Sequence, residues 1–352
     1  MEAKWNYLKW YEQQLPILKD LSIEIEATLN KIIKEQQITC HAVSARVKES
    51  HSFSKKIQKT KYTDPINQIQ DGLGLRIITY FESDLEKICA LIEANFDIDK
   101  DNSIDKKEGL GVDRVGYLSI HYIAKLTEQQ LLETPELEKF RDCVFEIQVR
   151  TLLQHTWAEI EHDKNYKFAG ELPKHLKRRF TLLAALLEMA DREFNELSKE
   201  IDNYSQKVSA DSHKGNLSAS IDSTSIKSYM DYKFSKLIEL GILNSFLKDT
   251  YEGRLIEELR SFGVTTLADL DSMIPADIVE NYRKGVNMDI LKKYNYSGLI
   301  RDIMLINDAD LYFETIWKAQ WNFIYQDQFR LIMSYSDRIK HYVDNGFIRV
   351  IA

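Results

Sequence analysis

The chain has 352 residues, which is enough for two domains or for one core with a substantial appendage. Its formal net charge of −8 argues against a general nucleic-acid coat, because binding to phosphate backbones regardless of sequence needs a basic surface. The three cysteines form neither a CxxC motif nor a Cys/His cluster, which argues against a disulfide framework and a structural zinc site. The chain opens in an amphipathic pattern, and no later apolar stretch is long enough to span a bilayer, so we expect a cytoplasmic protein without a membrane partner.

Residues 1–37 place apolar side chains at three-, four- and seven-residue intervals, which predicts one or two helices with one buried face. After them, short strand-like and helical runs alternate, and this predicts an α/β (α+β) fold with a mixed sheet. The expected strands are 42–47, 73–81 and 118–125, and the expected helices are 52–59 and 84–95. Residues 99–115 are rich in charge and contain two glycines, which predicts an exposed loop.

Residues 143–150 alternate apolar and polar side chains, which is typical of a strand with one polar face. The period becomes helical from residue 152, and a second long helix is expected over 176–197, where apolar residues repeat at strict four-three spacing and predict packing. We therefore divide the chain into a domain at 1–205, a linker at 206–225 and a mainly helical domain at 226–352.

Two carboxylates, Asp71 and Glu146, sit in apolar strand-like runs, and each is followed by an arginine four or five residues later. A buried carboxylate is costly unless it is paired, hydrogen-bonded or bound to a metal. Oxygen ligands beside guanidinium groups suit Mg²⁺ and a polyphosphate, although structural ion pairs have the same sequence pattern. In a regular strand Asp71 would point away from Arg76, so we expect Asp71 to precede the strand, with Gly72 and Gly74 relaxing the backbone.

Cations and an aromatic ring accompany the carboxylates. Arg46 and Lys48 share one face of a predicted strand and Lys56 lies on the next helix, so the three can converge on a triphosphate or form an ordinary solvated face. In the run Gly116-Tyr117-Leu118-Ser119-Ile120-His121, the tyrosine ring can stack on a base or pack in the core.

Taken in order, these motifs resemble the synthetase domain of RelA/SpoT-type alarmone synthetases. The resemblance covers residues 40–170, extends through the helices to about 205, and does not reach the C-terminal segment. Its motifs are Arg46-x-Lys48, Lys56, Asp71-x-x-Gly74-x-Arg76, Gly116-Tyr117-x-Ser119-x-His121, Glu146-Ile147-Gln148-Val149-Arg150-Thr151, Trp157-Ala158-Glu159-Ile160-Glu161-His162 and Tyr166-Lys167.

The resemblance implies a nucleotidyltransferase-like synthetase domain flanked by helices, which transfers the β,γ-pyrophosphate of ATP to the 3′-hydroxyl of GDP or GTP and releases AMP. It also implies residue roles by position: Asp71 and Glu146 as catalytic ligands of Mg²⁺; Arg46, Arg76, Lys48 and Lys56 for ATP; and Tyr117, His121, Gln148, Glu161 and Arg114 for the acceptor nucleotide. Only 45 residues precede Arg46 in this sequence, so we expect synthesis without the hydrolase domain of long family members.

Two departures from the family pattern leave the acceptor open. Val115 stands where many members have Asn, and His155 where small synthetases often have Asn. A toxic relative, in a toxin–antitoxin or phage-defence setting, that modifies adenine nucleotides or the tRNA 3′ end is therefore the alternative, and a nucleotide sensor is a third hypothesis. The C-terminal region is expected to be plain helical packing, a built-in regulator, or a binding region for tRNA or a protein, and a homo-oligomer is a further expectation because small relatives often form tetramers.

Overall fold

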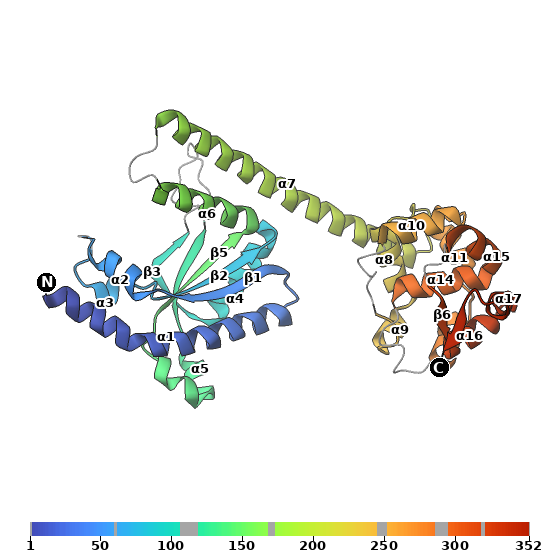
Figure 1. Cartoon of the computed structure of the whole chain (residues 1–352), viewed down its shortest axis with the longest axis horizontal. Coiled ribbons are helices and arrows are strands. Elements are labelled where there is room, and N and C mark those ends of the chain that lie inside the picture. Colours follow the sequence, from blue (N-terminus) through green and yellow to red (C-terminus); the bar gives the residue numbers. More distant parts are fainter. Residues whose placement is uncertain are drawn as a thin grey trace. The chain divides into compact units, whose positions relative to one another are not determined.

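The computed structural model describes residues 2–59, 62–105, 119–167, 173–244, 252–285, 295–317 and 321–351. The chain forms two compact units, Met1–Ser198 and Lys199–Ala352, and each has its own hydrophobic core. Figure 1 shows the sheet and helices of the first unit and the mostly helical second unit. The predicted fold class, a mixed sheet with helices followed by a mainly helical region, is confirmed.

The first unit is built on a five-stranded sheet of order β1-β2-β5-β4-β3. Strands β2 and β5 pair in parallel, and the other neighbours pair antiparallel, so the sheet is mixed. The elements, in chain order, are α1 (Glu2–Glu35), β1 (Cys40–Val47), α2 (Ser50–Ile57), α3 (Pro65–Gln68), β2 (Leu73–Thr79), α4 (Glu82–Asn95), β3 (Asp97–Asp105), β4 (Ile120–Lys125), α5 (Glu128–Glu133), the 3-10 helix η1 (Pro135–Phe140), β5 (Phe145–Thr151), α6 (Leu152–Lys167) and α7 (Lys174–His213), which runs into the second unit.

Side-chain alternation gives the sheet two different faces. Leu73, Leu75 and Ile77 of β2 are buried, as are the apolar residues of β5, and both sets belong to the core that α1 and α4 cover. The alternate residues, among them Arg76 and Gln148, lie on the other face, where α6 packs against β2 and β5 (Figure 1). A strand of period two therefore separates the core from a polar face.

Helix α1 covers the apolar face because its buried residues recur at helical spacing. The fully buried members of this stripe include Leu21, Ile25 and Leu29. Its Glu26 carboxylate also accepts a hydrogen bond from the backbone N–H of Ala45 at 3.0 Å, and this satisfies one donor of the edge strand β1. The prediction of one or two N-terminal helices resolves as a single helix.

The loop predicted at 99–115 is wrong for its first part, since residues 99–105 belong to strand β3. Among the described strands it lies at the edge of the sheet and pairs with β4, and it is irregular between Asp99 and Ile104. Edge strands tolerate charged residues, which face water, so the high charge of this segment did not indicate a loop. The rest of the predicted loop, from residue 106, lies outside the described residues.

The long helix α7 departs from its predicted packing. It buries Ala184, Asp191 and Asn195, whereas Leu183 and Phe194 of the four-three stripe are more than half exposed. The carboxylate of Asp191 accepts a hydrogen bond from Thr151, and the Asn195 side chain accepts one from the Ser83 backbone at 3.0 Å. Polar contacts thus hold this part of the helix on the rest of the first unit. The regular spacing of its apolar residues did not identify the buried side.

The second unit is mainly helical, as predicted, and also contains a small parallel pair of strands. Residues 206–213, assigned to a linker from their composition, continue α7, so the unit boundary lies within that helix. The elements after α7 are α8 (Ser223–Lys233), α9 (Ser235–Glu239), α10 (Glu252–Ser261), α11 (Leu267–Met273), α12 (Ile278–Gly285), α14 (Tyr296–Asn307), α15 (Ala309–Leu311), the π-helical turn η2 (Tyr312–Ile316), β6 (Phe323–Tyr325), α16 (Gln326–Met333), α17 (Arg338–Asp344) and β7 (Arg349–Ile351). Over the described parts of both units, no helix combines the length and apolar character needed to cross a membrane.

Helix α1 offers a matched test of how the first unit is held together. Leu21 is fully buried and Ile23, two residues on, is 70% exposed. We expect Leu21→Ala to lower the free energy of unfolding of this unit by about 2–5 kcal/mol, because the smaller side chain leaves a cavity. Ile23→Ala should change it by less than about 0.5 kcal/mol. Urea unfolding followed by hydrogen exchange at β2 and β5 measures both, and equal effects would contradict the assignment of the buried face.

Candidate active site

The strand registers bring the predicted site residues together on the polar face of the sheet. Gly74 of β2 pairs with Arg46 of β1 on one side and with Glu146 of β5 on the other. One step along, Arg76 pairs with Ser44 and with Gln148. Because Gly74 has no side chain, it leaves open space between the side chains of its two neighbours.

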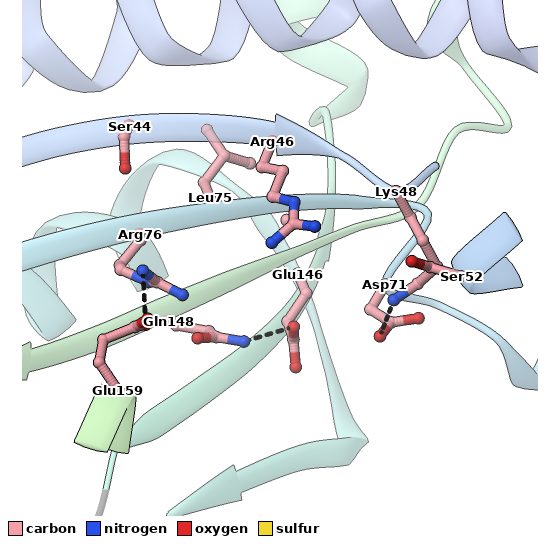
Figure 2. Close-up of a pocket in the computed structure, with 11 residues that line it drawn as sticks. Ser44, Arg46, Lys48, Ser52, Asp71, Leu75, Arg76, Glu146, Gln148 and Glu159 are labelled. Atoms are coloured by element: carbon pink, nitrogen blue, oxygen red, sulfur yellow. Dashed lines mark hydrogen bonds and ion pairs between the residues drawn. The ribbon is translucent and has the colours of Figure 1, made fainter. Parts of the chain in front are cut away.

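A cavity of about 330 Å³ occupies this face, which is within the range of small-ligand sites. Figure 2 shows Arg46 and Glu146 reaching into the same space, with Asp71 at one end and Glu159 at the other. The cavity is lined by Ser44, Arg46, Lys48, Ser52, Asp71, Gly74, Leu75, Arg76, Glu146, Gln148 and Glu159. Carboxylates and cations alternate around it, so it suits a ligand that carries both metal-binding oxygens and negative charge.

Asp71 is held between two lysines. Its Oδ2 atom accepts hydrogen bonds from Lys48 Nζ at 2.8 Å and from Lys56 Nζ at 2.6 Å, and Figure 2 shows the first of these contacts. Burial by itself would raise the pKa of this carboxyl, but the two lysines outweigh it and lower the pKa below its usual value. Its other oxygen, Oδ1, is buried and has no hydrogen-bond partner among the described residues.

Asp71 precedes strand β2, which begins at Leu73, so the position predicted from side-chain parity is confirmed. The expected role of the glycines is wrong, since neither Gly72 nor Gly74 adopts a positive φ. A side chain at Gly72 would instead meet the ring of Tyr11, 3.4 Å from the place of its Cβ atom. A Cβ atom at this distance would make ordinary van der Waals contact with α1, so neither backbone freedom nor lack of space requires glycine at position 72.

Tyr11 joins α1 to the segments that carry the site. Its hydroxyl lies 2.6 Å from the carbonyl oxygen of Lys48 and 3.2 Å from that of Gly72, and it donates toward both. Its ring stacks on Phe53 of α2 with the centroids 4.1 Å apart and the planes nearly parallel. Burial, and then the charge of Asp71, raise the pKa of Tyr11 to about 12, so the hydroxyl keeps its proton at neutral pH.

Glu146 is fixed by a chain of polar contacts across β4 and β5. Its Oε1 atom lies 2.7 Å from His121 Nδ1, and its Oε2 atom accepts from the Gln148 amide at 2.8 Å. Since a carboxylate only accepts, His121 donates from Nδ1, and its Nε2 lies 2.6 Å from the Ser119 hydroxyl oxygen. Burial would raise the pKa of Glu146, but the contacts with His121 and Gln148 prevail and lower it.

Arginines crowd the other end of the cavity. Arg76 pairs with Glu159 of α6 at 3.1 Å, and Arg150 donates to the oxygen of the Gln148 amide, which turns the amide nitrogen toward Glu146. Burial, and then the charge of Arg76, lower the pKa of Arg150 to about 10. The Arg150 guanidinium is therefore charged at neutral pH. Arg46 has no ion-pair partner within the described part of the chain.

The donor set fits a magnesium ion in part. No group of three or more histidine, cysteine or acidic side chains is placed to hold a metal among the described residues. Asp71 and Glu146 nevertheless line one cavity, and the orphaned Oδ1 atom of Asp71 is an oxygen suited to a cation. Mg²⁺ is commonly bound by one or two carboxylates together with substrate phosphates and water, which is the set that these residues provide.

The structure places most of the predicted site residues near one another. Arg46, Lys48, Asp71, Arg76, Glu146 and Gln148 line the cavity, and Lys56 and His121 contact its two carboxylates. Glu161 is exposed and is not among the cavity-lining residues. Arg114 and Tyr117 lie outside the described residues.

Among the described residues, sequence reasoning assigned no role in this site to Ser44, Ser52 or Glu159, which line the cavity, or to Tyr11, which contacts the segments that carry it. Ser44 shares the strand face of Arg46, so strand alternation could have identified it. Glu159 and Ser52 lie on helices, and nothing in the local pattern shows which strand a helical side chain meets. Tyr11 lies in α1, whose apolar period indicated packing only.

Comparisons with known proteins find relatives over the part of the chain that carries most of this site. The family model described as "Region found in RelA / SpoT proteins" matches residues 45–171. The GTP pyrophosphokinase YjbM of Bacillus subtilis (strain 168) is 30% identical over 163 residues, which are 45% of this chain and 72% of that protein. The GTP pyrophosphokinase YwaC of the same organism is 28% identical over 135 residues, which are 38% of this chain and 60% of that protein.

Among solved structures, the chain is similar to the small alarmone synthetase 1 from Bacillus subtilis, with a TM-score of 0.46 and 26% identity over 55% of this chain and 98% of that one. It is also similar to a GTP pyrophosphokinase family protein from Streptococcus pneumoniae, with a TM-score of 0.44 and 25% identity over 56% of this chain and 96% of that one.

The lowered pKa of Asp71 has a consequence for stability. A carboxyl whose pKa is lower in the folded state stabilises the fold above its usual pKa of 3.8, and this stabilisation is lost as the pH falls through the folded-state value. We expect Asp71→Asn to lower the free energy of unfolding by about 1–3 kcal/mol at pH 7, because two lysines lose their charged partner. The difference from wild type should shrink as the pH falls below 4.

Urea unfolding at pH 7 and at pH 3 measures this difference. The control is Asp20→Asn, which removes an exposed pair with Lys139 and should cost less than about 1 kcal/mol at either pH. An equal loss for Asp71→Asn at both pH values would contradict the stabilisation of the Asp71 carboxylate by Lys48 and Lys56.

Proposed function

Because this chain belongs to the RelA/SpoT family of pyrophosphokinases, we propose that it transfers the β,γ-pyrophosphate of ATP to the 3′-hydroxyl of GDP or GTP. The observation that carries the proposal is the joint placement of two ionised carboxylates and a group of cations in one cavity on the polar face of the sheet. Phosphoryl-type transfer depends on charge neutralisation and positioning more than on covalent help from the protein, and such a cavity supplies both.

In the proposed reaction, the acceptor 3′-oxygen forms a bond to the β-phosphorus of ATP. The bond between that phosphorus and the oxygen that bridges to the α-phosphate breaks, and AMP leaves with the electron pair. The proton of the 3′-hydroxyl passes to a base, and we assign this role to Glu146, whose lowered pKa keeps it ionised at neutral pH. His121 and Gln148 hold its two oxygens and fix its direction.

The donor nucleotide is assigned to the cations. Lys48 and Lys56 are proposed to bind the ATP phosphates, with Arg46 and Arg76 beside the adenine ring. Arg46 supports this role best, because its guanidinium reaches into the cavity without an ion-pair partner among the described residues (Figure 2). Asp71 and Glu146 would hold Mg²⁺, which supplies charge neutralisation on the phosphates when it is bound.

The acceptor is assigned to guanosine nucleotides because both curated relatives are named GTP pyrophosphokinases. His121 and Gln148 are proposed to line its site, with Arg114, Tyr117 and Glu161 as the further residues that the resemblance implies. No comparison favours adenine nucleotides or tRNA as the acceptor. The family match ends at residue 171, before the second unit, for which a regulatory or interaction role remains a proposal.

Purified protein incubated with labelled ATP and GTP or GDP should yield AMP and a guanosine nucleotide that carries a 3′-pyrophosphate. We expect Glu146→Gln to lower the turnover number by about a hundredfold or more, because a neutral amide does not accept the proton and binds a cation more weakly than a carboxylate does. Glu86→Gln, at an exposed position of α4, is the matched control and should leave turnover unchanged. The same assay with ATP alone or with tRNA tests the other acceptors, and a product formed only there would contradict the guanosine assignment.

The metal assignment has its own test. Removal of divalent cations with EDTA should abolish product formation, and added Mg²⁺ should restore it. Asp71→Asn should raise the Mg²⁺ concentration for half-maximal turnover by about tenfold, since one of two protein ligands is lost. Turnover that persists at full rate in EDTA would show that the two carboxylates do not act through a metal.

A further inference from the structure

We propose that Tyr11 of helix α1 is a positioning residue that sets the spacing of Lys48, Lys56 and Asp71. None of these three groups is on α1, and Tyr11 lines neither the cavity nor the polar face of the sheet. The inference rests on the proposed function for what the three groups do with nucleotide. It goes beyond that function by assigning part of the site geometry to a helix on the opposite face of the sheet.

The Tyr11 hydroxyl connects the two backbone segments that carry Lys48 and Asp71. Lys48 follows the end of β1, and Gly72 follows Asp71 immediately before β2. The backbone N–H of Lys48 donates to the Gly72 carbonyl at 2.9 Å, so the two segments are already joined once. The Tyr11 hydroxyl, directed at both carbonyl oxygens, adds a second connection at the point where regular strand pairing begins. The backbone segments that carry Lys48 and Asp71 are thus both connected to the Tyr11 hydroxyl.

The Tyr11 ring contacts the helix that carries Lys56. Tyr11 stacks on Phe53, which lies on α2 one turn before Lys56. Both rings are almost fully buried, with exposed fractions of 2% for Tyr11 and 1% for Phe53, so neither has room to move without disturbing its neighbours. The ring therefore fixes the helix that presents the second lysine, while the hydroxyl fixes the segments that present the first lysine and the carboxylate.

Gly72, next to Asp71, lies against helix α1. An added Cβ atom at Gly72 would lie 3.4 Å from the Tyr11 ring and 3.5 Å from the Leu18 side chain, at the lower edge of ordinary contact. These distances show how closely α1 approaches the segment that carries Asp71. The two lysines meet one oxygen of Asp71 at 2.8 and 2.6 Å, so a small shift of any of the three segments would separate them.

The conservative variant Tyr11→Phe removes one oxygen atom and keeps the stacked ring. We expect it to lower the turnover number by about tenfold, the effect of one lost buried hydrogen bond on the geometry of the reacting groups. The KM for the acceptor nucleotide should stay within about twofold, because the segments that Tyr11 holds carry the donor phosphates. Hydrogen exchange in the free protein should become about tenfold faster at the Lys48 amide and its neighbours.

The matched control is Tyr122→Phe. Tyr122 belongs to the same core, is 8% exposed, and donates its hydroxyl hydrogen bond to Glu93 at 2.8 Å, away from the three segments. This variant should leave turnover, and exchange at residue 48, as in wild type. Each variant is first compared with wild type by thermal unfolding.

The outcomes separate the two proposals. Wild-type turnover and wild-type exchange in Tyr11→Phe would overturn the positioning role, as would an equal loss of turnover in Tyr122→Phe. If the wild-type protein forms no product from ATP and a guanosine nucleotide, the proposed function fails. The exchange comparison, which needs no substrate, then still decides whether Tyr11 holds the segments that carry Lys48 and Asp71.

Discussion

The parallel pairing of β2 with β5, in matched register, is the constraint on which the rest of the first unit depends. Gly74 lies opposite Glu146, and Arg76 lies opposite Gln148, so the polar residues of both strands point to the same side. The alternate residues of both strands then point together into the core under α1 and α4. A shift of one residue in either strand would turn its charges into the core, so the pairing that fills the core also assembles the site.

The polar face remains compatible with folding because its charges are satisfied locally. Asp71 is balanced by two lysines, Glu146 by an imidazole and an amide, and Arg76 by Glu159. In each carboxylate the partners outweigh the effect of burial, which is why both pKa values fall. The chain as a whole is acidic, with a formal net charge of −8, and basic groups are nevertheless gathered at this cavity. Overall charge excluded a general nucleic-acid coat and left a local phosphate site possible.

Local patterns predicted the parts of this fold that local forces decide. The two faces of β5, and the position of Asp71 ahead of β2, follow from a period of two residues, which a sequence displays directly. Contacts between distant segments were not predictable in this way. Neither the pairing of Arg76 with Glu159 nor the reach of Tyr11 to Lys48 leaves a pattern in the sequence, because each depends on how a helix is placed on the sheet.

Two predictions made from charged or polar composition alone were wrong, because contacts with other segments decide the structure there. The charged residues 99–105 form an edge strand, because β4 pairs with one side of its backbone and water solvates its charged side chains. Residues 206–213 are mostly polar and yet continue α7, where Val208 packs into the core of the second unit. In α7 the apolar residues at regular spacing correctly predict a helix, but Leu183 and Phe194 of that stripe are exposed, so the spacing did not identify the buried side.

The ion pairs of the site also bear on how the proposed substrates would enter. Lys48 and Lys56 already place their ammonium groups on an oxygen anion, so a phosphate oxygen could replace Asp71 as their partner without a further loss of hydration for the lysines. Asp71, released from the lysines, would then have both oxygens available to a cation that accompanies the phosphates. The lysines and the carboxylate would exchange partners and keep their positions. Such an exchange needs the three groups to be held by the backbone that carries them, since their own contacts are the ones that change.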